Sequence, residues 1–168
     1  IDEAEAVVKE FRDRLGNKMQ IYFVIPDYYD DRPKACMNGW GAIHLTIGPN
    51  GDALPCQEAR VIKGLEFPNV RDEPLDWIWN NSPVFNAYRG DDWMKEPCKS
   101  CDEKEQDHGG CRCQSYLLTG DAANTDPVCS KSPMHDIVET CVSNAVNPRR
   151  VERPLVFRKK GASTTDFM

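Results

Sequence analysis

The chain has 168 residues, of which 40% are hydrophobic and 29% charged, a composition typical of a folded globular domain and unlike that of a fully disordered chain. Its formal net charge of −6 argues against a nucleic-acid-binding protein, because such a protein needs a basic face. No apolar run approaches the ~20 residues of a membrane-spanning helix, and no signal peptide is visible.

The first predicted elements are a helix and a strand. Apolar residues recur near helical spacing over residues 2–15 (DEAEAVVKEFRDRL), and Gly16 follows them. The β-rich run at residues 19–25 (MQIYFVI) predicts a short strand that ends at Pro26. A helix followed by a buried strand normally belongs to a larger parallel sheet, so we interpret this unit as part of one.

The next predicted elements are a hairpin and two short helices. Residues 43–47 and 52–55, joined by Gly-Pro-Asn-Gly, predict a β-hairpin. Residues 74–80 and 83–89 predict helices, each with a proline near its first turn. We expect a small core made of the apolar residues of these helices, namely Trp77, Ile78, Phe85 and Tyr88.

Two further helices are predicted at residues 112–119 and 133–145. The segment from Asn147 to Met168 is basic, contains proline and lacks clear periodicity. We therefore expect an extended or mobile tail there.

The eight cysteines are the unusual feature of the composition. Four of them, Cys98, Cys101, Cys111 and Cys113, lie in one short charged stretch. A Cys-x2-Cys turn such as Cys98–Cys101 can direct two thiolates toward one metal centre. Local cysteines cannot complete a four-ligand site, so cysteines distant in the sequence have to contribute. Each distant ligand that binds the metal closes a long loop of the chain.

Three kinds of site compete for these cysteines. A zinc module is typified by two Cys-x2-Cys pairs, and only Cys98/Cys101 fits that pattern. Disulfides are disfavoured because the chain is longer than the usual disulfide scaffold and has no visible secretory signal. Iron–sulfur ligation is favoured, because thiolate-rich sites with scattered ligands are typical of clusters.

The residues between the cysteines leave several alternatives open. Asp107 is either a solvated acid or a metal ligand, and His108 is a rival ligand because imidazole also binds iron. Arg112 either offsets the charge of an anionic centre or faces water. Gly109 and Gly110 would let the backbone approach an inorganic core without a Cβ clash.

The cysteine pattern resembles the SPASM domain, a C-terminal extension of radical S-adenosylmethionine (radical SAM) enzymes that carries two auxiliary iron–sulfur clusters. The resemblance rests on Cys36-x14-Gly51-x4-Cys56 followed by Cys98-x2-Cys101 and the later cysteines. In related domains the third element is usually C-x2-C-x5-C-x3-C, whereas this chain has Asp107 at the third position.

That departure, with the extra Cys113, is similar to one branch of the family, the PqqA peptide cyclases of pyrroloquinoline quinone (PQQ) biosynthesis. The similarity covers roughly residues 22–137 and includes the stretches KACMNGWG, KGLEFPNVRD, YRGDDWMKEPCKSCDEKEQD, GGCRCQ and LTGDAANTDPVCSKSP.

The resemblance implies two ligand sets. The first auxiliary cluster, [2Fe–2S] or [4Fe–4S], would be held by Cys36, Cys56, Cys111 and Cys113. The second auxiliary cluster, a [4Fe–4S], would be held by Cys98, Cys101, Asp107 and Cys129. Cys141 lies outside both sets.

The resemblance also implies a fold class, which is α+β. Residues 1–34 would be the last helix and strand of a partial (β/α) radical SAM barrel. Residues 35–131 would form a small, loop-rich SPASM domain with a β-hairpin and short helices. Residues 132–168 would form a helix and an extended tail.

The activity implied is that of a cytoplasmic oxidoreductase that joins a glutamate and a tyrosine side chain of the PqqA precursor peptide by a carbon–carbon bond. Its partners would be that peptide, the PqqD peptide chaperone and an electron donor such as flavodoxin. The C-x3-C-x2-C motif of the S-adenosylmethionine-cleaving cluster is absent from this sequence. We therefore expect this segment to be inactive alone and assign it no catalytic residue. The alternative is a non-enzymatic zinc or iron–sulfur module that binds a partner.

Overall fold

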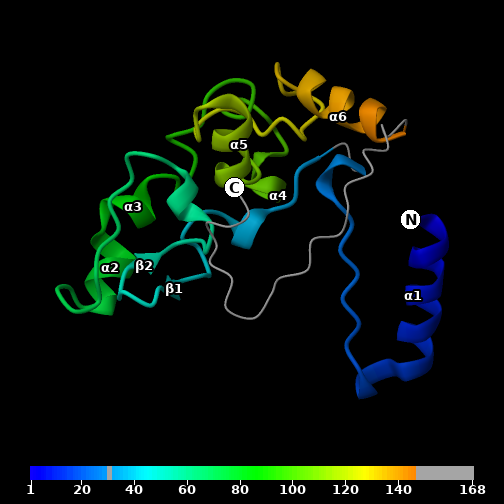
Figure 1. Ribbon diagram of the computed structural model, residues 1–168, viewed down its shortest axis with the longest axis horizontal. Coiled ribbons are helices and arrows are strands. Elements are labelled where there is room, and N and C mark those ends of the chain that lie inside the picture. The colour runs from blue at the N-terminus through cyan, green and yellow to red at the C-terminus, as the bar shows by residue number, and fades with distance from the viewer. Residues whose placement is uncertain (30–31, 147–168) are drawn as a thin grey trace, which may run out of the picture.

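Short helices and long loops make up most of the computed structural model, which describes residues 1–29 and 32–146 (Figure 1). None of its helices is long and apolar enough to cross a membrane within these described ranges. In chain order the helices and strands are α1 (Asp2–Leu15), β1 (Thr46–Ile47), β2 (Ala53–Leu54), α2 (Leu75–Asn81), α3 (Pro83–Asn86), α4 (Lys104–Asp107), α5 (Arg112–Thr119) and α6 (Asp136–Val146).

Helix α1 confirms the prediction over residues 2–15, but the strand predicted at residues 19–25 is wrong. This segment is extended and pairs with no strand among the described residues, and Tyr22 and Val24 are each 76% exposed. A strand forms only where a neighbour accepts its backbone hydrogen bonds, and α1 and this segment lie apart from the rest of the fold (Figure 1).

The predicted hairpin is confirmed with shorter strands. Thr46 pairs with Leu54 and Ile47 with Ala53, in antiparallel register. The turn closes because the Gly48 N–H donates to the Asp52 carbonyl at 2.8 Å. This hairpin ends two residues before Cys56, so it fixes where that thiol enters the core.

Helices α2 and α3 confirm the two predicted helices, and the second ends earlier than expected. Ile78 and Phe85 are completely buried, as predicted, and Tyr88 is half-buried. The prediction for Trp77 is wrong: its side chain is 38% exposed. Neighbouring helical residues point about 100° apart, so Trp77 cannot share the inward direction of Ile78.

Trp40 takes a place in the core that the sequence did not reveal. Its side chain is 7% exposed, and its indole N–H donates to the Val84 carbonyl at 2.7 Å. The ring also packs edge-on against Tyr88, with 5.3 Å between centroids. This packing joins the segment around Cys36 to α3.

Helices α5 and α6 confirm two more predictions, with α6 starting at Asp136 rather than residue 133. The short α4, at the charged run before the glycine pair, was not predicted. The tail predicted at residues 147–168 lies outside the described residues.

Asp126 ties the loops around the cysteines together. Its carboxylate is fully buried and accepts hydrogen bonds from the Cys111 N–H at 2.8 Å, the Gln114 amide at 2.9 Å and the Val128 N–H at 3.1 Å. Burial raises the pKa of Asp126, and these hydrogen bonds oppose the rise. Gly110, with φ +78°, lets the backbone pass directly beside this carboxylate.

Replacing Gly110 with alanine should destabilise the fold well beyond the cost of a positive φ. A Cβ at this position would lie 2.6 Å from Asp126 Oδ2 and 2.8 Å from the Pro33 Cβ. Gly120→Ala is the matched control, because Gly120 has φ +79° and open space around it. The control should lose roughly 1–2 kcal/mol from the left-handed backbone alone. We expect Gly110→Ala to lose a further ~1–3 kcal/mol from overpacking, measured by denaturant unfolding. Equal losses in the two variants would contradict this.

Candidate metal centres

Four cysteines from three parts of the chain converge on one small cavity. Cys36 lies in a 3-10 turn, Cys56 follows β2, Cys111 caps α5 and Cys113 lies in its first turn. Cys36, Cys56 and Cys113 line the cavity, and Cys111 contacts two of them through its thiol. The structure thus brings together the whole set that the resemblance assigns to the first cluster.

The four thiols of this first set lie beside one another. The neighbouring Cys111 and Cys56 thiols, together with burial, raise the pKa of Cys36 and Cys113. The neighbouring Cys113 and Cys36 thiols lower the pKa of Cys56 to about 3 and that of Cys111 to about 2. The four sulfurs are therefore grouped closely enough to serve one metal centre.

The second predicted set also lines a single cavity. Cys98, Cys101, Asp107 and Cys129 surround it, together with Pro97, Thr125 and two lysines. The hydroxyl of Thr125 lies 3.4 Å from the Cys98 sulfur. Burial raises the pKa of Cys98 and Cys129, and the nearby Asp107 carboxylate contributes to the rise.

Asp107 is not a solvated acid. Its side chain is 8% exposed at the end of α4, and its Oδ1 accepts the Gly109 N–H at 2.8 Å. The rival His108 adopts a left-handed conformation at the C-cap, and its ring lies against Gly39 instead of lining the cavity. Of these two neighbours, only Asp107 is therefore placed beside the three thiols.

Positive side chains surround the second set. Lys104 and Lys131 line the cavity, and the Lys131 ammonium lies 3.6 Å from the Cys101 sulfur. Lys131 also forms a 2.7 Å ion pair with Glu103, which in turn pairs with Arg32. Cys101, Asp102 and Glu103 place donor atoms close together too, but these ion pairs already engage Glu103. Ammonium groups at this position favour an anionic centre.

Both glycines lie in tight protein packing, and Gly110 also lines the cavity of the first set, as the expected close approach of the backbone requires. A Cβ on Gly109 would lie 2.9 Å from the Trp93 ring, and one on Gly110 would meet Asp126 and Pro33. The predicted solvent-facing alternative for Arg112 is wrong, since its side chain is only 3% exposed.

All eight cysteines are free thiols, which disfavours the disulfide alternative. Cys141 is exposed on α6 and lies outside both sets, as expected. Thiolates are the characteristic ligands of iron–sulfur clusters, so four converging thiols and a set of three thiols with a buried carboxylate suit such groups chemically.

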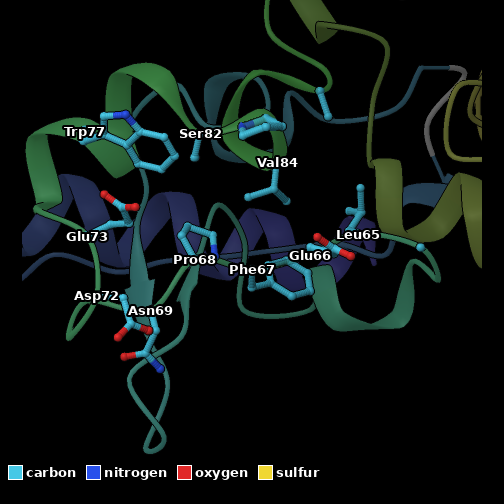
Figure 2. Close-up of a pocket in the computed structure, with 13 residues that line it drawn as sticks. Leu65, Glu66, Phe67, Pro68, Asn69, Asp72, Glu73, Trp77, Ser82 and Val84 are labelled. Atoms are coloured by element: carbon cyan, nitrogen blue, oxygen red, sulfur yellow. The ribbon is translucent and has the colours of Figure 1, made fainter.

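A larger cavity of about 640 Å³ is lined by residues between Gly64 and Ala87, none of which belongs to either thiol set (Figure 2). Phe67, Trp77 and Val84 are among its apolar lining residues, and Glu66, Asp72 and Glu73 add carboxylates. It contains no cysteine or histidine, so it offers no site for a soft metal.

Several residues around the thiol sets were missed by the sequence reasoning. Asp126 precedes Pro127, a pair that favours a local turn in which the carboxylate caps a backbone N–H two residues on, and this signal could have identified it. Lys131 and Thr125 gave no comparable signal, because their approach to the thiols depends on how the loops fold.

A comparison with known families matches a segment that holds the first members of both sets. The matched segment contains Cys36, Cys56, Cys98 and Cys101, and the remaining members of both sets follow it in the chain. Domains of this family occur in radical SAM oxidoreductases. Residues 36–102 match the model of the SPASM family, an iron–sulfur cluster-binding domain.

Proposed function

We propose that the chain is the auxiliary-cluster part of a radical SAM peptide cyclase of the PqqE type. Such an enzyme joins a glutamate and a tyrosine side chain of the PqqA precursor peptide by a carbon–carbon bond during PQQ biosynthesis. The bound clusters would supply electron transfer and would hold the loops of residues 35–131 together. The PqqD chaperone and an electron donor such as flavodoxin are the partners that the resemblance implies.

The observation that carries this proposal is the position of Asp107. A buried carboxylate lies in one cavity with Cys98, Cys101 and Cys129, where the usual family pattern has a fourth cysteine. A solvated loop acid would not be buried at the end of a helix beside three thiols. The convergence of Cys113 on the first set supports the same branch of the family.

The contacts among the thiols differ between the two sets. In the first set the thiols of Cys36 and Cys113 lie beside those of Cys56 and Cys111. In the second set Cys98 and Cys129 interact with each other and with Asp107 through their charges. We assign a [2Fe–2S] cluster to the first set and a [4Fe–4S] cluster to the second, as the resemblance implies.

The N-terminal region supports a place beside a larger barrel. Helix α1 has no buried residue, and Val7 and Phe11 on it are 48% and 36% exposed. The extended segment that follows is even more exposed, with Tyr22 and Val24 each 76% exposed. We infer that residues 1–34 are the C-terminal end of a radical SAM barrel, in which residues 19–25 would pair as a strand only with neighbouring barrel strands, and those strands would cover these apolar side chains.

A zinc module is the second candidate, and the four adjacent thiols of the first set favour it specifically. Four thiolates in mutual contact also suit a single tetrahedral zinc ion. Metal and sulfide analysis of anaerobically prepared protein separates the two. We expect about six iron atoms per chain with matching sulfide and broad visible absorption, whereas zinc in a colourless protein would overturn the proposal.

The two sets should lose their metal independently. Cys56→Ala should remove the first cluster and keep the second, and Cys129→Ala should do the reverse, because each residue lines only one cavity. Cys141→Ala is the control and should keep both, since Cys141 is exposed and outside the sets. Iron content and electron paramagnetic resonance (EPR) of the reduced proteins check this. Loss of both signals in a folded single variant would contradict the pairing.

Substitution of Asp107 should change the second cluster specifically. Asp107→Cys should keep the iron and change the reduction potential and EPR signal, because thiolate is a softer donor than carboxylate. Asp107→Ala should leave an open iron position and a cluster that loses iron faster to a chelator. Asp102→Ala is the matched control, because its carboxylate is 93% exposed. Iron content, potential and spectrum unchanged in Asp107→Ala would show that Asp107 is not a ligand.

A further inference from the structure

Arg112 is a buried cation with no carboxylate in ion-pair contact among the described residues. A guanidinium stays protonated in proteins, and burying it is unfavourable unless negative charges lie nearby. Burial lowers its pKa, while the charges of Asp126, Cys98 and Cys111 raise it. Asp126 acts most strongly of these three, and the two cysteines belong to the two different thiol sets.

Backbone carbonyls accept hydrogen bonds from part of the Arg112 guanidinium. Nη1 donates to the Ala122 carbonyl at 2.7 Å and to the Asn124 carbonyl at 2.9 Å, and Nη2 donates to the Gly109 carbonyl. The guanidinium also stacks over the Trp93 ring, with Cζ 4.6 Å from its centroid. These contacts account for both terminal nitrogens, but the buried Nε–H has no partner among the described residues.

The position of Arg112 relates it to both thiol sets. It lies between Cys111 and Cys113 in the chain and lines the cavity of the first set. Its Nη1 also donates to the carbonyl of Asn124, and the next residue, Thr125, lines the second cavity with its hydroxyl 3.4 Å from the Cys98 sulfur. The charges of Arg112 and Cys98 accordingly act on one another. Lys104 and Lys131, in contrast, line only the second cavity.

We propose that Arg112 is a positive charge shared by the two auxiliary clusters, which raises the reduction potential of both. This inference rests on the proposed function, because it requires clusters at both sets. A cluster with thiolate ligands is an anion, and reduction adds another negative charge to it. A fixed buried cation close to both therefore favours the reduced state of each and weakens the repulsion between them.

A purely structural role for Arg112 predicts something else. If its function were only to tie the loops through carbonyl bonds, its replacement would lower stability and leave the potentials of the remaining clusters unchanged. Arg89 shows such a role elsewhere in the fold. It donates to the Gly41 and Trp79 carbonyls and lies 5.0 Å from the Trp79 ring, but it lines neither thiol cavity.

The test is a redox titration of the anaerobically loaded full chain, followed by EPR, for Arg112→Gln, Arg112→Lys and the matched control Arg89→Gln. In Arg112→Gln the ratio of reduced to oxidised cluster, measured at the wild-type midpoint potential, should fall about tenfold at both centres. This corresponds to a midpoint potential lowered by about 59 mV for a one-electron couple. Arg112→Lys should restore most of this ratio because it keeps the charge, and Arg89→Gln should not change it.

The other outcomes are equally decisive. Unchanged potentials in Arg112→Gln, a shift at one centre only, or an equal shift in Arg112→Lys would overturn the proposal. If Arg112→Gln takes up neither cluster, uptake of both by Arg112→Lys supports the shared charge, and failure of both variants overturns it. A wild-type chain that holds no iron and sulfide would instead refute the proposed function itself.

Discussion

The structure depends on bringing side chains from distant parts of the chain onto two small cavities. The strands have two residues each, and no helix between residues 32 and 134 is longer than the eight residues of α5. Closing loops such as the one from Cys56 to Cys111 costs chain entropy. The few backbone hydrogen bonds of regular secondary structure in this region offset little of that cost. Metal ligation can offset such a cost, because the free energy of binding becomes free energy of folding.

The protein groups around the cavities prepare this convergence. Asp126 fixes the backbone at Cys111 and at Val128, which lies next to Cys129 of the other set. The same carboxylate leaves no room for a side chain at Gly110. One buried acid therefore positions the backbone next to a cysteine of each set. These hydrogen bonds fix the conformation of loops that contain little secondary structure.

Sequence reasoning was most successful where the local pattern was strong. The period of α1, the Gly-Pro-Asn-Gly turn and the proline before α2 placed these elements within a few residues. It failed where the outcome depends on distant partners: residues 19–25 look like a strand but pair with none, and Trp77 is exposed while Trp40 is buried. The spacing of the cysteines identified a metal site, but only the fold brings Cys36 to Cys111 and buries Asp107.

The order of the two ligand sets along the chain has a consequence for biogenesis. The sets are interleaved: Cys98, Cys101 and Asp107 lie between Cys56 and Cys111, and Cys129 follows the last member of the first set. Neither set is contained in a contiguous stretch of its own, so neither centre could be cut out and transplanted as an autonomous module. During synthesis, both sets remain incomplete until the chain has been extended past residue 113, and only 16 residues then separate completion of the first set from that of the second. The two sets are therefore completed in quick succession, and a truncation between Cys113 and Cys129 would leave the thiols of Cys98 and Cys101 without their last partner and open to oxidation.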